Sequence, residues 1–287
     1  MFKHVIRALF FGAACIAPLP VEALASQSSS TNVLLIYTAP DHPHGTHMYE
    51  HECRLLARCL EQSQGVKTEV SLGWPSDRRL LENIDCIVLY SRPGGEIVLA
   101  EEVREQFMGL MQAGVGFVAI HWGTSPGDPQ WADQYMELLG GCFHRSFSVP
   151  PLAVTQERLV QIDREHPICR GWTSYDLRDE WYLATRLDPR ARPLLKVTVS
   201  PNAAQGRPEP IDLTVAWTLE RSAPGRGRSF GTTLGHFHDN FGIEAFRRML
   251  VNGILWAAGV EVPVHGAPVR VDDSDLILAP PAPKEGK

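Results

Sequence analysis

Histidines gather in three segments that each follow an apolar run of the chain. The run Phe117–Ile120 stops at His121, where the chain turns. His236 and His238 follow another strand-like run further along the sequence. After the first apolar run come His42, His44, His47 and His51. Because imidazole can act as base, acid or metal ligand near neutral pH, these three segments are the first candidates for a functional site.

A structural role is the alternative for each of these side chains. His42 and His44 flank a proline and are expected in a solvated loop. His47 and His51 stand at positions i and i+4, so they could pair as metal ligands on one face of a helix, although His51 could equally be a surface residue. His121 could be a hydrogen-bonded core histidine. However, a sharp turn after a strand exposes the residue at the turn, as in a nucleophile elbow, and this favours a functional role.

Acidic and aromatic side chains adjoin in the segment DLRDEWY, residues 176–182. Asp179 and Glu180 point to opposite sides of an extended chain, so only one of them can face a given pocket. An acid beside Trp181 and Tyr182 suits sugar binding or acid–base chemistry. A solvated strand edge is the alternative.

Apolar periodicity predicts alternating strands and helices in the first half of the chain. Strands are expected at 33–37, 66–72, 84–90 and 116–120, and helices at 47–62 and 98–113. Short apolar strands separated by helices indicate a parallel sheet covered on both faces. The second half is mixed, with strands expected at 194–199, 213–220 and 228–236 and a closing helix at 241–257. Ligands bind beyond the carboxyl ends of parallel strands, so the three histidine segments should converge on one edge of the sheet.

The ends of the chain carry their own signals. Residues 1–25 have a basic start, an apolar run and a small-residue cleavage site, which predict a signal peptide and a secreted or periplasmic protein. Residues 26–32 are expected to form a flexible lead, and the Pro-rich residues 261–287 an irregular tail. No later apolar stretch is long enough to insert into a membrane. Five cysteines follow residue 25, an odd number that implies no disulfide framework.

Composition and missing motifs exclude several function classes. The net charge is −6 and there is no basic stripe, which argues against nucleic acid and anionic membranes as partners and favours a neutral polar ligand such as a sugar. The sequence lacks GxSxG, GxGxxG, P-loop, CxxC and HExxH motifs. A serine hydrolase, a nicotinamide enzyme and a phosphotransferase are therefore disfavoured. Whether the chain forms a homo-oligomer is left open.

Five segments together resemble the ThuA-like, trehalose-utilisation family. They are GTHMYE, GVGFVAIHW, EHPICRGW, DEWY and RSFGTTLGHFHDNFGIEAFRRMLVNGILWAAG. The resemblance implies a ThuA-like domain at 33–260 with the flavodoxin-like, doubly wound α/β fold of class I glutamine amidotransferases: a mostly parallel sheet with helices on both faces. It also implies a role in handling disaccharides or their oxidised 3-keto forms, with pocket residues His47, His121, Glu180 and His236. His121 stands where the amidotransferases carry a nucleophilic cysteine, so glutamine hydrolysis is not expected.

The leading hypothesis is a secreted, metal-assisted enzyme that acts on a small carbohydrate. His47, His121 and His236 would bind a divalent ion such as zinc, because three imidazoles and an open fourth position form a known catalytic zinc arrangement. Glu180 would be a fourth ligand or, together with His121, a catalytic residue in isomerisation or cleavage of a disaccharide or its 3-keto derivative. The residues expected to bind substrate are Trp122, Trp181, Tyr182, His238 and Asp239, although Asp239 could instead cap a helix. A non-catalytic carbohydrate-binding domain and a protein that scavenges or senses metal are the alternatives.

Overall fold

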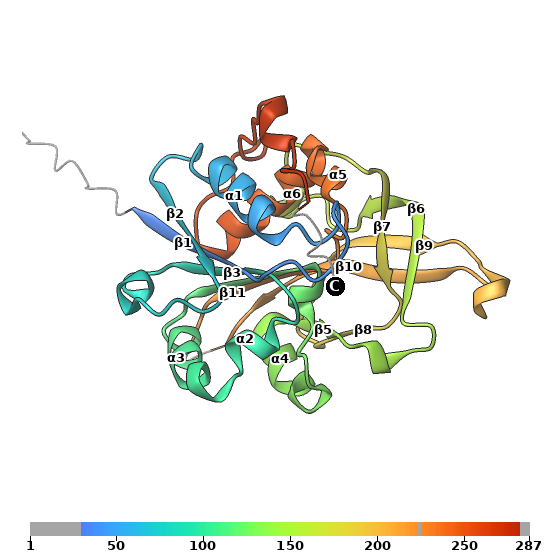
Figure 1. Cartoon of the computed structure of the whole chain (residues 1–287), viewed down its shortest axis with the longest axis horizontal. Helices are drawn as coiled ribbons and strands as arrows, with labels where there is room; N and C mark the ends of the chain where they lie inside the picture. The colour runs from blue at the N-terminus through green and yellow to red at the C-terminus, as the bar shows by residue number, and fades with distance from the viewer. Residues whose placement is uncertain (1–29, 223–224, 282–287) are drawn as a thin grey trace, which may run out of the picture.

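A nine-stranded sheet forms the centre of the computed structural model, which describes residues 30–222 and 225–281 (Figure 1). In order of neighbours, its parallel half consists of β2 (Val66–Leu72), β1 (Thr31–Tyr37), β3 (Cys86–Tyr90), β4 (Gly116–Ile120) and β11 (Arg228–Thr232). The antiparallel half continues with β10 (Ile211–Glu220), β9 (Arg192–Val199), β6 (Leu152–Gln161) and β7 (Tyr175–Tyr182). A separate two-stranded sheet is formed by β5 (Gly141–Phe143) and β8 (Thr185–Leu187).

Helices cover both faces of the parallel half because its central strands are apolar throughout. Every residue of β3 and β4 is buried, as expected for strands covered on both sides. On one face lie α1 (Tyr49–Leu60) and α6 (Glu244–Ala257); on the other lie α2 (Gly95–Val98), α3 (Glu101–Gln112) and α4 (Ala132–Leu139) (Figure 1). The buried side chains form one apolar cluster on each side of the sheet. The predicted flavodoxin-like, doubly wound α/β fold is confirmed.

The sheet is more evenly mixed than the sequence predicts. Among the described strands, four pairings within the large sheet are parallel and four are antiparallel. The unpredicted strand β6 has polar side chains and alternating burial, so it lacks the continuous apolar run that marks β3 and β4. This antiparallel extension matters for function because its last strand, β7, carries the segment DLRDEWY.

Several element boundaries differ from the prediction, and α4 was missed. The predicted helix 98–113 is present as α3, and the short α2 precedes it. The predicted closing helix 241–257 is present as α6, and the short α5 (His238–Phe241) precedes it. The predicted strand 228–236 ends at Thr232. The chain beyond Thr232 is therefore free to leave the plane of the sheet and deliver His236 to its edge.

The tail after α6 is packed although nearly devoid of regular structure. Its regular element is one short 3-10 turn, η7 (Asp273–Leu276), while Val262, Ala267 and Val269 are buried against the domain. The five described cysteines are buried and none is in a disulfide.

The predicted signal peptide and most of the predicted flexible lead lie outside the described residues. No helix within the described ranges is long and apolar enough to cross a membrane.

Candidate metal centre

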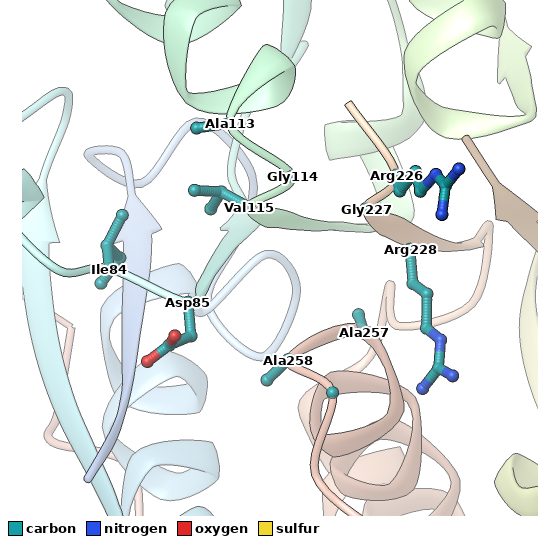
Figure 2. A pocket seen from close by; sticks show the side chains of 11 residues that line it. Ile84, Asp85, Ala113, Gly114, Val115, Arg226, Gly227, Arg228, Ala257 and Ala258 are labelled. Atoms are coloured by element: carbon teal, nitrogen blue, oxygen red, sulfur yellow. The ribbon is translucent and has the colours of Figure 1, made fainter. Parts of the chain in front are cut away.

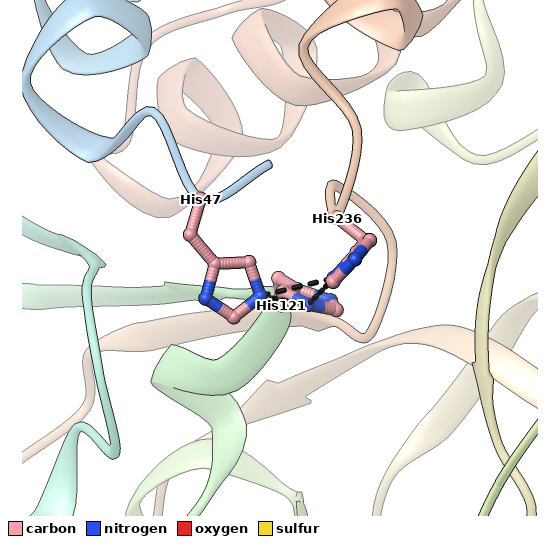
Figure 3. Close-up of side chains that lie close together, drawn as sticks. All are labelled: His47, His121 and His236. Carbon is pink, nitrogen blue, oxygen red and sulfur yellow. Dashed lines mark hydrogen bonds between the residues drawn. The ribbon is translucent and has the colours of Figure 1, made fainter. Parts of the chain in front are cut away.

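Three histidines from distant parts of the chain meet beyond the carboxyl ends of the parallel strands (Figure 3). Nε2 of His47 lies 3.0 Å from Nδ1 of His236 and 3.0 Å from Nε2 of His121. Nδ1 of His236 lies 3.2 Å from Nε2 of His121. All three side chains are buried. Each ring thus directs one nitrogen towards a common centre, as the imidazole ligands of a metal ion do.

The backbone takes unusual conformations to deliver these rings. His121 directly follows β4 with a φ of +54°, and His47, in the loop after β1, has a φ of +50°. A positive φ is uncommon for residues other than glycine, and such strain is concentrated at functional sites. Gly235, with a φ of +118°, turns the chain just before His236. Strained backbone therefore coincides with two of the three ring positions, and a glycine turn precedes the third.

Hydrogen bonds on the far sides of two rings determine which nitrogen carries the proton. Nδ1 of His121 lies 2.8 Å from the carbonyl oxygen of Thr233, which can only accept, so Nδ1–H donates and Nε2 keeps its lone pair. Nδ1 of His47 lies 3.0 Å from Oδ1 of Asp41 and 2.7 Å from the hydroxyl of Tyr49, which itself donates to Asp41. His47 therefore also donates from Nδ1, and the lone pairs of both Nε2 atoms point into the cluster.

Two lone pairs that face each other at 3.0 Å repel unless positive charge lies between them. Within the described chain, Nδ1 of His236 and the hydroxyl of Tyr182, 3.3 Å from Nε2 of His121, are placed to donate into the cluster. Each can satisfy one nitrogen, but neither comes between the two Nε2 atoms. A cation bound by all three rings would do so. Carbonyl and carboxylate acceptors behind the rings are also what metal-binding histidines usually have.

Burial keeps the three rings neutral. It lowers the pKa of His47 to about 2 and that of His236 to about 4, and the positive charge of neighbouring histidines acts in the same direction. The pKa of His121 is lowered well below its ordinary value, again mainly by burial. Since the neutral imidazole is the form that binds metal, the rings are ready to act as ligands at neutral pH.

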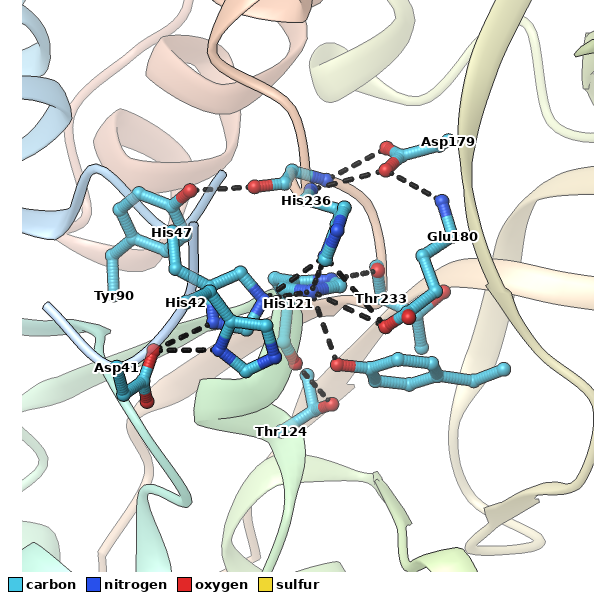
Figure 4. A network of polar contacts seen from close by, with 12 residues as sticks. Asp41, His42, His47, Tyr90, His121, Thr124, Asp179, Glu180, Thr233 and His236 are labelled. Atoms are coloured by element: carbon cyan, nitrogen blue, oxygen red, sulfur yellow. Dashed lines mark hydrogen bonds and ion pairs between the residues drawn. The ribbon is translucent and has the colours of Figure 1, made fainter. Parts of the chain in front are cut away.

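One face of β7 brings an acid and a hydroxyl to the same centre. Side chains alternate along a strand, so Glu180 and Tyr182 share a face. Oε2 of Glu180 lies 3.8 Å from Nε2 of His121 and 3.7 Å from Nδ1 of His236 (Figure 4). Burial raises the pKa of Glu180, which favours a carboxyl group that can exchange a proton. Glu180 therefore lies where a fourth ligand or a general base would stand.

The opposite face of β7 supports the site from behind through Asp179. Its fully buried carboxylate accepts hydrogen bonds from the backbone N–H groups of Gly235 (2.8 Å), His236 (3.0 Å) and Glu180 (2.8 Å). Burial raises the pKa of Asp179 to about 7, although the three N–H donors favour the charged form. This carboxylate ties together the backbone of two site residues.

Trp181 lies in the core and not in the pocket where it is expected from the sequence. Its side chain is 0% exposed, and its Nε1 donates to the backbone carbonyl and the hydroxyl of Thr155. The physical reason is strand alternation. The same period of two that turns Glu180 and Tyr182 towards the histidines turns Trp181 into the core.

His238 and Asp239 also lie outside the pocket that surrounds the three histidines. Nδ1 of His238 pairs with Oε1 of Glu52 at 2.5 Å, and its Nε2 donates to the carbonyl oxygen of Leu276 at 2.8 Å. Asp239 is exposed in the first turn of α5 and provides no side-chain N-cap, since the N-cap residue is Phe237. The helix α5 begins at His238, after the N-cap residue Phe237, and carries both side chains away from the centre.

Asp41, His42 and Arg145 lie at the site, although the sequence analysis leaves them out or assigns them to a solvated loop. Oδ1 of Asp41 lies 2.8 Å from Nδ1 of His42 as well as within hydrogen-bond distance of His47 (Figure 4). The rings of His42 and His47 lie with centroids 3.6 Å apart. The density of histidines was a usable signal for His42. For Arg145, nothing in the local sequence marks a role.

A small hollow of about 20 Å³ lies in front of the cluster, room for one ion or water molecule. It is lined by His42, His47, Trp122, Phe143, Arg145, Leu152, Glu180 and Tyr182. The predicted residues Trp122 and Tyr182 are thus at the site.

A hollow of about 400 Å³ lies at the opposite edge of the sheet, where the parallel strands begin (Figure 2). It is bordered by Asp85, Val115 and Arg228, which precede or begin strands, and by the end of α6. Despite its size it gathers no set of imidazoles and carboxylates among the described side chains. The candidate site is therefore identified by its imidazole and carboxylate groups and not by the volume of its hollow.

Comparisons with known proteins agree with this architecture. The model of the ThuA family, described as trehalose utilisation, matches residues 33–257. A ThuA-like protein from Bacteroides uniformis has a similar structure, with a TM-score of 0.58 and 16% identity over 82% of this chain and 94% of that chain. No curated protein sequence matches.

Two glutamine-hydrolysing proteins are more distant structural neighbours. The glutaminase domain of a Trypanosoma brucei CTPS has a TM-score of 0.44 and 8% identity over 84% of this chain and 100% of its own. A glutamine amidotransferase from Thermotoga maritima has a TM-score of 0.41 and 11% identity over 79% of this chain and 98% of its own. The match of the family model spans most of the sequence and all three histidines of the cluster. The chain belongs to the ThuA family.

Proposed function

We propose that this chain is a secreted, metal-dependent enzyme that acts on a disaccharide or on its 3-keto derivative. The family description, trehalose utilisation, supports a carbohydrate as substrate. The observation that carries the metal is the 3.0 Å distance between the Nε2 atoms of His47 and His121, while acceptors lie at the Nδ1 atom of each ring. Three nitrogen ligands favour zinc as the first candidate ion.

The residues around the cluster suit proton transfer next to a carbonyl group. A bound divalent ion would polarise a carbonyl oxygen or acidify a water molecule. Glu180 is placed to take up and return a proton, and Tyr182 to donate a hydrogen bond to a substrate oxygen. In a 3-keto sugar the hydrogens beside the carbonyl are acidic, so their removal by Glu180 would lead to isomerisation or to eliminative cleavage.

The size of the hollow limits how a sugar can bind. A space of about 20 Å³ admits one oxygen atom of a substrate but not a sugar ring. The ring would therefore rest across the mouth, against the half-buried Trp122, while one oxygen reaches the histidines.

Glu180→Gln tests the catalytic proposal because it keeps the side-chain shape and removes the base. Metal-loaded protein would be screened for turnover of neutral disaccharides and their 3-keto derivatives, with and without a chelator. We expect chelation to abolish turnover and Glu180→Gln to lower kcat by about 10²–10⁴-fold. The exposed Glu209→Gln serves as the matched control and should leave kcat unchanged.

Two results would point elsewhere. A metal-loaded protein that binds these sugars without changing them would be the carbohydrate-binding domain of the alternative hypothesis. Full activity of the Glu180→Gln variant would remove Glu180 from the mechanism.

A further inference from the structure

Two arginines near the candidate site have no acidic partner among the described residues. Arg145 lines the hollow beside Glu180 and Tyr182, is exposed, and has no carboxylate within 4.0 Å among the residues that the structure describes. Arg178 is likewise exposed and unpaired in the described chain. Its guanidinium lies 4.1 Å from the ring centroid of Phe237, the residue after His236. Most exposed arginines elsewhere, such as Arg158 and Arg190, are paired with an acid.

The fold gives both arginines a defined position relative to the histidines. Arg178 and Glu180 lie on the same face of β7, two residues apart. Arg145 lines the same hollow as Glu180 and begins the short turn η4 (Arg145–Phe147), whose preceding residue His144 accepts a hydrogen bond from the backbone N–H of Ser146. One guanidinium therefore borders the hollow, and the other lies on the face of β7 that carries Glu180.

The acidic groups nearby leave this positive charge largely uncompensated. The carboxylate of Asp41 is already bonded to His42, His47 and Tyr49. Asp179 is buried behind the strand and bonded to three backbone N–H groups. Among these acids, Glu180 alone shares the hollow with Arg145 and a face of β7 with Arg178, and a divalent cation would add further positive charge.

We propose that the substrate carries an anionic group, a carboxylate or a phosphate, that is bound by Arg145 with support from Arg178. This inference rests on the proposed function and narrows its substrate class to anionic carbohydrates. A guanidinium presents a planar set of donors that fits both oxyanions with paired hydrogen bonds. The exposed position of Arg145 at the rim matches a substituent that stays outside the small hollow while another substrate oxygen enters it.

A simpler role for Arg145 is to favour the ionised form of Glu180: burial raises the pKa of that carboxyl, and the positive charges of His42 and Arg145 partly oppose the rise. The two roles differ in their dependence on the ligand. Stabilisation of Glu180 would affect neutral and anionic sugars equally, whereas anion binding affects only the charged ones.

Three ligands that differ at one C6 atom separate these roles: trehalose, trehalose oxidised at C6 to the carboxylate, and trehalose 6-phosphate. Binding to metal-loaded protein would be measured by calorimetry at low ionic strength. We expect at least one anionic ligand to bind about 10-fold or more tightly than trehalose, and the stronger of the two identifies the oxyanion. Arg145→Gln should abolish this preference and Arg178→Gln should reduce it. Arg164→Gln, an exposed arginine beyond the far end of β6, should preserve it.

Equal or tighter binding of trehalose, or a preference that survives in Arg145→Gln, would overturn the inference. Such a result would leave the proposed function intact, because neutral sugar would still bind to the metal-loaded protein. If no metal binds to the three histidines, the proposed function itself fails, and this is detected before any sugar is added.

Discussion

At the scale of single residues, the geometry of the candidate site depends on the hydrogen-bond acceptors that position each histidine. The carbonyl of Thr233 and the carboxylate of Asp41 fix the protons of His121 and His47 on the outward nitrogens. Asp179 fixes the backbone of His236. Such supporting groups are typical of metal sites, where their loss costs about 10–100-fold in metal affinity.

Asp179→Asn should therefore weaken both the fold and the site. The amide offers one acceptor oxygen where the carboxylate offers two, and its NH₂ group would face backbone N–H donors. We expect a loss of about 1–3 kcal/mol in the free energy of unfolding, measured with urea, and weaker metal binding. Asp176→Asn, on the same strand but exposed, should change stability by less than about 0.5 kcal/mol. Equal stability of the two variants would contradict the supporting role of Asp179.

Residue types and strand ends suffice to predict much of this site, but not its supporting contacts. His47, His121, Glu180 and His236 can be selected because they follow or belong to strand-like segments that one fold brings together. The burial of Trp181 was predictable, because side chains alternate along a strand and Trp181 follows Glu180, which faces the pocket. The bonds of Thr233 and Asp41 depend on loop conformations that no local pattern encodes.

At the scale of elements, the tail is bound to the loop and helix that carry the site. Nε2 atoms of three histidines donate to tail carbonyl oxygens: His44 to Ala279 (2.9 Å), His51 to Asp275 (2.9 Å) and His238 to Leu276 (2.8 Å). His44 lies in the same loop as His47. These three histidines, which do not join the cluster, therefore bind the tail to the rest of the domain.

Ending the chain at Val271 should lower its stability. Three hydrogen bonds would be lost, each worth about 0.5–1.5 kcal/mol, and the loop of His47 would be less restrained. We expect a lower Tm and a weaker affinity for metal. Asp275→Asn is the control, because it removes the ion pair with Arg58 but keeps the backbone carbonyls. A truncated protein as stable as the full chain would show that these contacts contribute nothing.

The turn at His166 predicts a defined pH dependence. Nδ1 of His166 accepts from the backbone N–H of Ile168, and burial lowers the pKa of the ring to about 4. Unfolded histidine takes up its proton near pH 6.5, so from pH 6.5 down to 4 the unfolded state binds more protons and stability falls. His166→Asn retains an acceptor but does not titrate. Between pH 6.5 and pH 4, the free energy of unfolding of the wild type, measured with urea, should therefore fall more than that of the variant. A difference between the two that stays constant over this range would contradict the prediction.

Helices and strands could be predicted from the sequence where they are buried on one face or on all sides, because such burial leaves a clear apolar pattern. The fully buried strands β3 and β4 stand out in the sequence as apolar runs, and the parallel half follows from them. The antiparallel half is harder, because β6 and β7 mix exposed and buried side chains. The pairing of β6 with β7 is determined by the arrangement of the whole sheet, and no local sequence pattern indicates it.

At the scale of the whole molecule, the two edges of the sheet differ in chemistry. Of the two hollows, the larger lies where the parallel strands begin and includes Arg226 and Arg228 in its lining. The edge where the parallel strands end has the cluster of three imidazoles and the carboxylate of Glu180. The candidate site is therefore placed at the carboxyl edge.

Elemental analysis of protein purified without a histidine tag tests the central claim most directly. The account predicts one equivalent of a divalent metal, zinc first, retained by the wild type and by the exposed variant His265→Asn. It also predicts at least a 10-fold weaker affinity in His47→Asn, His121→Asn and His236→Asn. A folded wild type that neither contains nor takes up a stoichiometric divalent ion, or variants that bind it equally well, would contradict the account.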